Sequence, residues 1–127
     1  MKLRIKGNSL RLRVSRSELA RLVGGSRIEE TIQFTPACES RFTYALDSAL
    51  QGSPIRVNYG PQKITVVLAH EKVLTWSSES EIGVYGTVDI GSSGQLEIIV
   101  EKDFACLDRS DEENQDTFAN PHAGATC

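Results

Sequence analysis

The chain of 127 residues is poor in aromatic residues, in cysteine and in long apolar runs. Aromatic residues make up 6% of it, and its three cysteines are Cys38, Cys106 and Cys127. No two of these cysteines show the short spacing that a zinc site requires, and their odd number argues against a disulfide framework. We therefore expect reduced thiols and a cytoplasmic location.

Segments that could enter a membrane are also missing. The longest apolar stretches, at 64–69 and 98–100, have the length of a strand and are far too short to cross a bilayer. Lysine and arginine interrupt every aliphatic pair near the first residue, a pattern that does not fit a signal peptide. No membrane partner is expected.

Motifs of catalysis are absent as well. The sequence contains no P-loop, no G-x-G-x-x-G, no H-E-x-x-H and no G-x-S-x-G. Its two histidines, His70 and His122, lie in no recognisable pairing of a nucleophile with a base. Cys106 follows a predicted strand and is typical of a small buried apolar residue. These absences favour a binding or interaction domain over an enzyme, and no cofactor is expected.

The charges, by contrast, are distributed very unevenly. Residues 1–27 carry eight Lys/Arg and one Glu, so residues 28–127 hold six of the 14 cations and 16 of the 17 acids. The two balances, +7 and −10, give the net charge of −3. Such asymmetry indicates either a surface for anions or two segments that meet in the fold.

Five of the cations form a stripe in the segment KLRIKGNSLRLRV, residues 2–14. They alternate with aliphatic residues, so they share one face of a strand: Lys2, Arg4, Lys6, Arg11 and Arg13. A turn at Gly7-Asn8 would fold the segment into a hairpin with Arg4 opposite Arg11, and opposed like charges destabilise a strand pair. A single strand with a bulge at 7–9 avoids that opposition. Both alternatives keep the cations on one face.

Alternation and turn residues predict the remaining elements. Ser15 and Glu18 have the spacing of a capping box, so a short helix is expected over 15–24, ending at Gly24-Gly25. Strands are expected near 28–34, 42–46, 55–59, 63–69, 82–90 and 96–100, with a second short helix within 69–80. Residues 57 and 64 should pair in one hairpin and 88 and 98 in another, and no internal repeat is evident.

These elements predict a β-dominated α+β fold in a single domain, 1–127. Seven or eight strands in hairpin order indicate an antiparallel, strongly curved sheet or a partly closed barrel, with one or two short helices. Residues 105–127 have little periodicity and an acidic run at 111–116, so an irregular C-terminal segment is expected, with Phe118 and Pro121 as its anchors.

The stripe has a possible acidic counterpart late in the chain. Four carboxylates share one face of the strands near 82–103: Asp89, Glu97, Glu101 and Asp103. We expect Arg4, Arg11 or Arg13 to lie within ion-pair distance of Glu97, Glu101 or Asp103, because no acid near the stripe except Glu18 can offset its charge. Cations left unpaired over a hollow would form a binding site for an anionic ligand or a protein partner.

An alternative combines the two charged strands into a catalytic centre. Cations would hold a polyphosphate or nucleotide, while Glu97, Glu101 and Asp103 would bind Mg²⁺. This arrangement resembles the triphosphate-tunnel enzymes, eight-stranded barrels with charged lumens, and the resemblance implies metal-dependent phosphohydrolysis. Their first strand carries E-x-E-x-K, whereas residues 2–6 read KLRIK without a carboxylate. Nucleic acid is not expected as a partner, given the pI of about 5.4 and the absence of aromatic residues among the cations.

Two further segments carry a resemblance over nearly the whole chain. The N-terminal KLRIKGNSLRLRVS and the C-terminal EKDFACLDR, followed by NP, resemble a family of short uncharacterised bacterial proteins. No activity is known for that family, so the resemblance implies a bacterial cytoplasmic protein and assigns no function.

Overall fold

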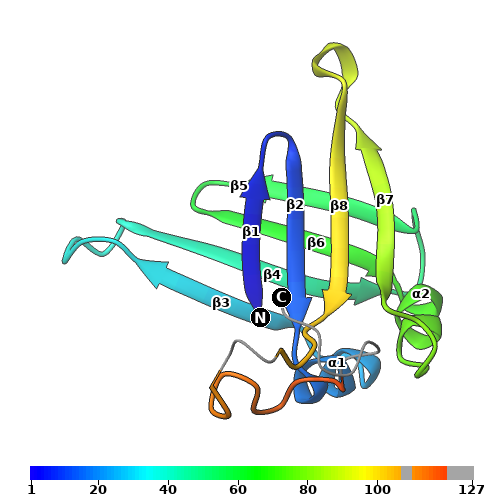
Figure 1. Ribbon diagram of the computed structural model, residues 1–127. Helices are drawn as coiled ribbons and strands as arrows, with labels where there is room; N and C mark the ends of the chain where they lie inside the picture. The colour runs from blue at the N-terminus through cyan, green and yellow to red at the C-terminus, as the bar shows by residue number, and fades with distance from the viewer. Residues whose placement is uncertain (107–109, 120–127) are drawn as a thin grey trace.

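Two four-stranded sheets make up most of the computed structural model, which describes residues 1–106 and 110–119 (Figure 1). Sheet A has the strand order β1 (Lys2–Lys6), β2 (Ser9–Val14), β8 (Gln95–Lys102), β7 (Gly83–Asp89). Sheet B has the order β3 (Ile28–Gln33), β4 (Arg41–Ala49), β6 (Lys63–Ala69), β5 (Ile55–Gly60). The sheets lie face to face with their strands crossing, and the helices α1 (Arg16–Val23) and α2 (His70–Trp76) lie at one end.

Each sheet joins two antiparallel hairpins along a central parallel pair, β2 with β8 in sheet A and β4 with β6 in sheet B. The β-dominated α+β fold is therefore confirmed, with eight strands and two short helices among the described residues. The prediction of a wholly antiparallel sheet or a partly closed barrel is wrong. Alternation along the sequence indicates hairpins, but it does not indicate how the hairpins join. The inner strands of neighbouring hairpins pair in parallel in both sheets, and α1 and α2 each carry the chain from one sheet to the other.

The first thirteen residues form the hairpin and not the bulged strand. Leu3 pairs with Leu12 and Arg4 with Arg11, through a two-residue turn in which Gly7 has φ +55°. Glycine adopts this left-handed conformation without steric strain. The opposition of like charges is thus present in the structure.

Local signals at α1 behave as predicted. The Ser15 hydroxyl accepts a hydrogen bond from the Glu18 amide, and Glu18 accepts one from the Ser15 amide, which completes the capping box. The chain leaves the helix at Gly24 and turns at Gly25, which has φ +89°. Leu19 and Leu22 face the core, and their burial stabilises a helix too short to persist alone.

Two hairpin registers differ from the predictions by two residues. Val57 pairs with Val66, and Ile64 pairs with Tyr59, because the chain turns in only two residues at Pro61-Gln62. In the β7–β8 hairpin, Val88 pairs with Leu96 and Ile98 with Gly86. The loop there includes a short 3₁₀ turn, Gly91–Ser93. In both hairpins the predicted set of residues on each face of the strand is still correct, because side chains alternate with a period of two and the shift is two residues.

The topology contains an internal repeat that the sequence does not reveal. The unit hairpin–helix–hairpin occurs twice, as β1-β2-α1-β3-β4 and as β5-β6-α2-β7-β8. A residue of the second unit corresponds to the residue 54 positions earlier in the first unit. The pair Val57–Val66 thus corresponds to the pair Leu3–Leu12. The central pair Leu46–Val66 likewise becomes Val100–Leu12. Each unit contributes one hairpin to sheet A and one hairpin to sheet B. The strand pairing is therefore the same when the two units are exchanged, which gives the fold approximate two-fold symmetry.

The shared feature of the two units is their apolar core. Leu12 and Val66 are both 2% exposed, and Leu22 and Trp76, at corresponding positions of α1 and α2, are 0% and 1% exposed. Complete burial of one such side chain contributes roughly 1.5–3 kcal/mol. The pattern of buried positions is therefore shared by the two units, although residue identity and size are not.

The C-terminal segment is anchored by Phe118. Its amide donates to the carbonyl of Asp103, its carbonyl accepts from Ala105, and its ring contacts that of Phe104 edge to face. In the described part of the segment, 105–106 and 110–119, there is no helix or strand. Pro121, His122 and Cys127 lie outside the described residues.

The cysteines only partly follow the prediction. Cys38 is an exposed free thiol, whereas Cys106 is buried and disulfide-bonded. The prediction that all three thiols are reduced is therefore wrong for Cys106, and cysteine usage no longer argues for a reducing compartment. No helix in the described part of the chain is long and apolar enough to cross a membrane.

Candidate anion-binding site

All five cations of the stripe lie on the outer face of sheet A. Leu10, Leu12 and Val14 are buried in the core, so the residues between them, Arg11 and Arg13, face outward. On β1, Lys2 and Arg4 pair with Arg13 and Arg11 and therefore face outward too, and so does Lys6, which has the same parity. All three are exposed. The cations therefore form two columns, one on each strand of the hairpin, and no other labelled helix or strand lies over this face of β1 and β2 in Figure 1.

The predicted meeting of the stripe with the acidic strand is confirmed. β2 lies beside β8, and Arg11 Nε is 3.2 Å from Glu101 Oε1. Lys2 Nζ also donates to Asp103 Oδ2 at 2.8 Å. Segments that are nearly 90 residues apart in the chain thus offset part of each other's charge, and such pairs at a surface contribute about 0–1 kcal/mol.

Glu101 also accepts a hydrogen bond from the Tyr85 hydroxyl at 3.0 Å. Burial, together with this hydrogen bond to a carboxylate, raises the pKa of Tyr85 to about 12. Arg11 Nε is buried and, within the described chain, has no hydrogen bond, since its contact with Glu101 meets the distance of an ion pair only. Arg11 is therefore incompletely satisfied by its one acidic partner.

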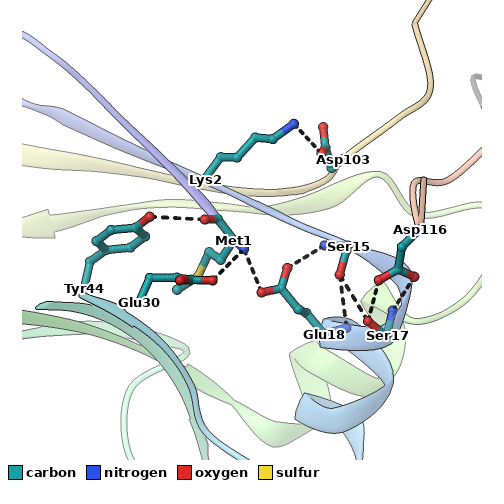
Figure 2. Close-up of polar contacts among 9 residues, drawn as sticks. All are labelled: Met1, Lys2, Ser15, Ser17, Glu18, Glu30, Tyr44, Asp103 and Asp116. Atoms are coloured by element: carbon teal, nitrogen blue, oxygen red, sulfur yellow. Dashed lines mark hydrogen bonds and ion pairs between the residues drawn. The ribbon is translucent and has the colours of Figure 1, made fainter. Parts of the chain in front are cut away.

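The lower end of the stripe meets a well-paired polar cluster, shown in Figure 2. The ammonium of Met1 donates to Glu18 at 2.7 Å and lies 3.5 Å from Glu30, while its carbonyl accepts from the Tyr44 hydroxyl. Burial acts to raise the pKa of Glu18, but hydrogen bonds from the ammonium and from Ser15 outweigh it and lower the pKa. Glu18 is consequently a carboxylate committed to structure.

Next to Glu18 in Figure 2, Asp116 ties the C-terminal segment to α1. It accepts hydrogen bonds from the amide and hydroxyl of Ser17, and the hydroxyl bond lowers the pKa of Asp116. A hollow of about 370 Å³ lies here, but carboxylates line it as well as cations. Such a lining has no surplus of either sign, so this end of the stripe is a poor site for an anion.

The upper end of the stripe is different. Among the described residues, three cations of the stripe make no ion pair: Arg4 and Lys6 at this end, and Arg13 at the lower end. Two of them, Arg4 and Lys6, line a hollow of about 150 Å³ together with Ser9, Arg11 and Ile99. Three positive groups and one hydroxyl therefore converge on a recess that no carboxylate lines.

The three carboxylates of the catalytic alternative are not brought together. Glu97 lies opposite Ser9 and Thr87, Glu101 contacts Arg11 and Tyr85, and Asp103 contacts Lys2. Within residues 1–106 and 110–119, no three His, Cys, Asp or Glu side chains are placed to hold a metal ion. The charged lumen of a triphosphate tunnel is also missing, because the cations face outward from an open sheet.

Two residues of the hollow were not predicted. Ser9 has the same parity as Arg11 and Arg13 and lies at the turn, so alternation alone could have placed it beside Lys6. Ile99 lies opposite Arg11 on β8, and only the parallel pairing of β2 with β8 brings it there. No signal in the sequence indicates that pairing.

The chain belongs to the DUF7009 family, a family of unknown function, whose pattern matches residues 1–122. The resemblance to an uncharacterised family is thereby confirmed, while bacterial origin stays a prediction. No curated protein and no solved structure matches the chain.

Proposed function

We propose that this protein is a non-catalytic binding module for a multivalent, phosphate-bearing anion, held on the outer face of the β1–β2 hairpin. The observation that carries the proposal is the direct opposition of Arg4 and Arg11 beside a hollow that both of them line. Like charges in this position destabilise the folded chain, so a sequence selected for stability alone would not place them there.

An anion in the hollow would relieve that repulsion. The guanidinium groups of Arg4 and Arg11 offer paired donors, which match the oxygens of a phosphate or carboxylate better than a single ammonium does. Lys6 and the Ser9 hydroxyl would add a charge and a further donor. The Nε atom of Arg11 is buried 3.2 Å from Glu101 Oε1, so the anion would contact the other nitrogens of this guanidinium and leave the ion pair in place.

The dimensions favour several linked anionic groups. A hollow of about 150 Å³ is smaller than the roughly 300–1,000 Å³ of pockets that enclose whole organic ligands, so it fits one group. From Lys6 to Lys2 the column of β1 is about 13 Å long, at about 3.3 Å per residue. Further groups would lie along this column over Arg4, short of the pair formed by Lys2 and Asp103.

The carboxylates of β8 restrict where such a ligand can lie. Glu97 and Glu101 lie beside the stripe on the neighbouring strand β8, and they would repel an anion that extended across the sheet. A long nucleic acid is disfavoured for this reason, and because the stripe contains no aromatic residue on which bases could stack.

Calorimetric titration with tripolyphosphate tests the proposal. We expect binding by the unaltered chain, a rise in its melting temperature with ligand, and weakening by at least about tenfold in the double variant Arg4→Gln/Lys6→Gln. Arg41→Gln is the matched control, because Arg41 is an exposed strand residue of sheet B without an ion pair to another described residue.

Equal weakening in the control, or no binding at low salt, would refute the site. Release of phosphate from tripolyphosphate in the presence of Mg²⁺ or Mn²⁺, lost in Glu101→Gln, would instead support the phosphohydrolase alternative and contradict the non-catalytic role.

A further inference from the structure

A second concave surface lies away from the stripe, between the edge strands β5 and β7. Its volume is about 560 Å³, and α2 closes one end. Apolar side chains form its floor and walls, chiefly Ile55, Trp76, Val84 and Val88. This volume lies within the range of binding pockets, and an apolar surface with polar groups at its rim is typical of them.

The lining identifies a groove along the edge of a strand. All seven consecutive residues of β7, Gly83–Asp89, contribute to it. Successive side chains of a strand point to opposite faces, so a surface lined by every residue must follow the strand's edge. β7 is the last strand of sheet A, and this edge is not paired with another strand of the described chain.

The hydrogen bonds around β7 show which backbone groups face the groove. The Lys102 amide donates to the Ile82 carbonyl, and the Ile90 amide donates to the Gly94 carbonyl, at the two ends of the β7–β8 ladder. Bonded and non-bonded pairs alternate in an antiparallel ladder, so Val84, Gly86 and Val88 bond to β8. Tyr85 and Thr87 therefore direct their N–H and C=O groups outward.

We propose that this groove binds an extended peptide segment, which adds to β7 as a further strand. Outward donors and acceptors of Tyr85 and Thr87 would pair with its backbone. Its alternate side chains would be apolar and would pack beside Gly86, over Ile55 and Trp76. Gly86 lets Ile55 approach the strand closely, because a Cβ atom at this position would lie 2.6 Å from Ile55 Cδ1 and would displace that side chain.

A free peptide fits this edge better than a second copy of the chain. Unpaired edges can join two identical sheets. Here, however, the edge is recessed between β5 and α2, and the β7 edge of a second copy would be recessed in the same way. Two recessed edges cannot approach to the distance between paired strands, which is about 4.7–4.9 Å. A single extended segment can enter the groove.

The probe is a displayed library of random linear peptides, selected on the full chain, with the most enriched peptide synthesised. We expect enriched sequences to carry apolar residues at every second position. Proline in place of Thr87 removes an outward N–H while leaving the bonds to β8, which edge strands tolerate. Thr87→Pro should therefore weaken binding of the synthetic peptide by about tenfold or more in fluorescence anisotropy.

Thr31→Pro is the matched control. Thr31 lies on β3, the edge strand of sheet B that corresponds to β7, and the bond from the Phe34 amide to the Ser40 carbonyl shows by the same alternation that its N–H also points outward. It should leave peptide affinity unchanged within about twofold. Methylation of alternate backbone nitrogens in the peptide should abolish binding if the backbone is what pairs.

Amide hydrogen exchange of the unaltered chain keeps the test decisive if Thr87→Pro does not fold. Peptide should slow exchange at Tyr85 and Thr87 and leave Thr31 unchanged. Absence of enrichment, binding that survives both methylation and Thr87→Pro, or protection at Thr31 instead of Thr87 would overturn the proposal. So would a dimer that disappears in Thr87→Pro, because that result would assign the edge to a second copy.

Discussion

On the outer face of sheet B, Arg27 lies 3.1 Å from Glu29 and 3.5 Å from Asp47 and donates to the Thr65 hydroxyl. On the outer face of sheet A, the position corresponding to Thr65 is Arg11, and the position corresponding to Asp47 is Glu101. The first arrangement surrounds one cation with acceptors. The second places one carboxylate among several cations.

This difference arises on an equivalent framework. The two units have the same strand pairing and a similar apolar core, so stability does not require the outer faces to differ. Sheet B shows that this fold can surround a surface cation with enough acceptors to balance its charge. The imbalance on sheet A therefore points to a requirement other than folding, and the proposed binding of an anion would meet it.

Truncation of the core should produce the largest effects, and equal effects in the two units would confirm their equivalence. Leu22→Ala should lower the free energy of unfolding by about 2–5 kcal/mol and Trp76→Ala by about 3–5 kcal/mol, since both side chains are fully buried. Urea denaturation measures both. Leu50→Ala, at an exposed position, should change stability by less than about 0.5 kcal/mol. A large loss in one helix only would contradict a shared core.

The acid dependence of stability should distinguish the units next. The pKa of Glu18 is lowered in the folded chain, so its contribution is complete above its unfolded value near 4.5 and is lost as the pH falls below that value. Glu18→Gln should lower stability at neutral pH by about 1–3 kcal/mol.

The same substitution should also flatten the acid limb of the stability curve, measured by urea denaturation between pH 3 and 7. Lys72→Gln, at the corresponding position of α2, is the control and should leave the limb unchanged. A parallel loss of stability with pH in Glu18→Gln and in the unaltered chain would show that Glu18 is not the group responsible.

The helix caps offer a reciprocal test of smaller size. Ser15 caps α1 through its side chain, whereas Ala69, at the corresponding position before α2, makes no such bond. Ser15→Ala should destabilise by about 0.5–2 kcal/mol, and Ala69→Ser should recover part of that amount in α2. Thermal unfolding of the two single variants and the double variant gives the comparison. Stabilisation by Ser15→Ala would be incompatible with the capping box.

The smallest expected change is also the one that separates stability from binding. Arg4→Glu replaces a repulsive opposition to Arg11 with an attractive one and should stabilise the unliganded chain by ~0.2–1 kcal/mol. Asn58→Glu, at the corresponding position of β5, lies opposite Thr65 and should not stabilise. If Arg4→Glu destabilised the chain, the argument from charge repulsion would fail.

Local features of this fold could be predicted because they depend on neighbouring residues. The capping box of Ser15 and Glu18, the facing of each strand and the gathering of the stripe on one face follow from spacing alone. Meeting of the stripe with Glu101 followed from the charge balance. Each of these depends on a pattern within one element or on the sum of charges.

Features that depend on long-range pairing could not be predicted. Nothing in residues 9–14 or 95–102 specifies that these strands pair in parallel, and the repeat is hidden because corresponding residues share polarity but not identity. Ile99, which completes the hollow, acquires its role only through that pairing, and Gly86 acquires its role only because β7 lies beside Ile55 of the other sheet. The groove itself could not be predicted, because it lies between edges of two different sheets.

Backbone amide chemical shifts during titration with tripolyphosphate test the central claim most directly, because they report both outer faces in one experiment. We expect perturbations at Arg4, Lys6, Ser9 and Arg11 on sheet A and none at the corresponding positions of sheet B, Asn58 and Thr65 among them. Saturable shifts confined to the hollow would confirm the assignment. Shifts of equal size on both faces, or shifts centred on Arg27, would contradict it.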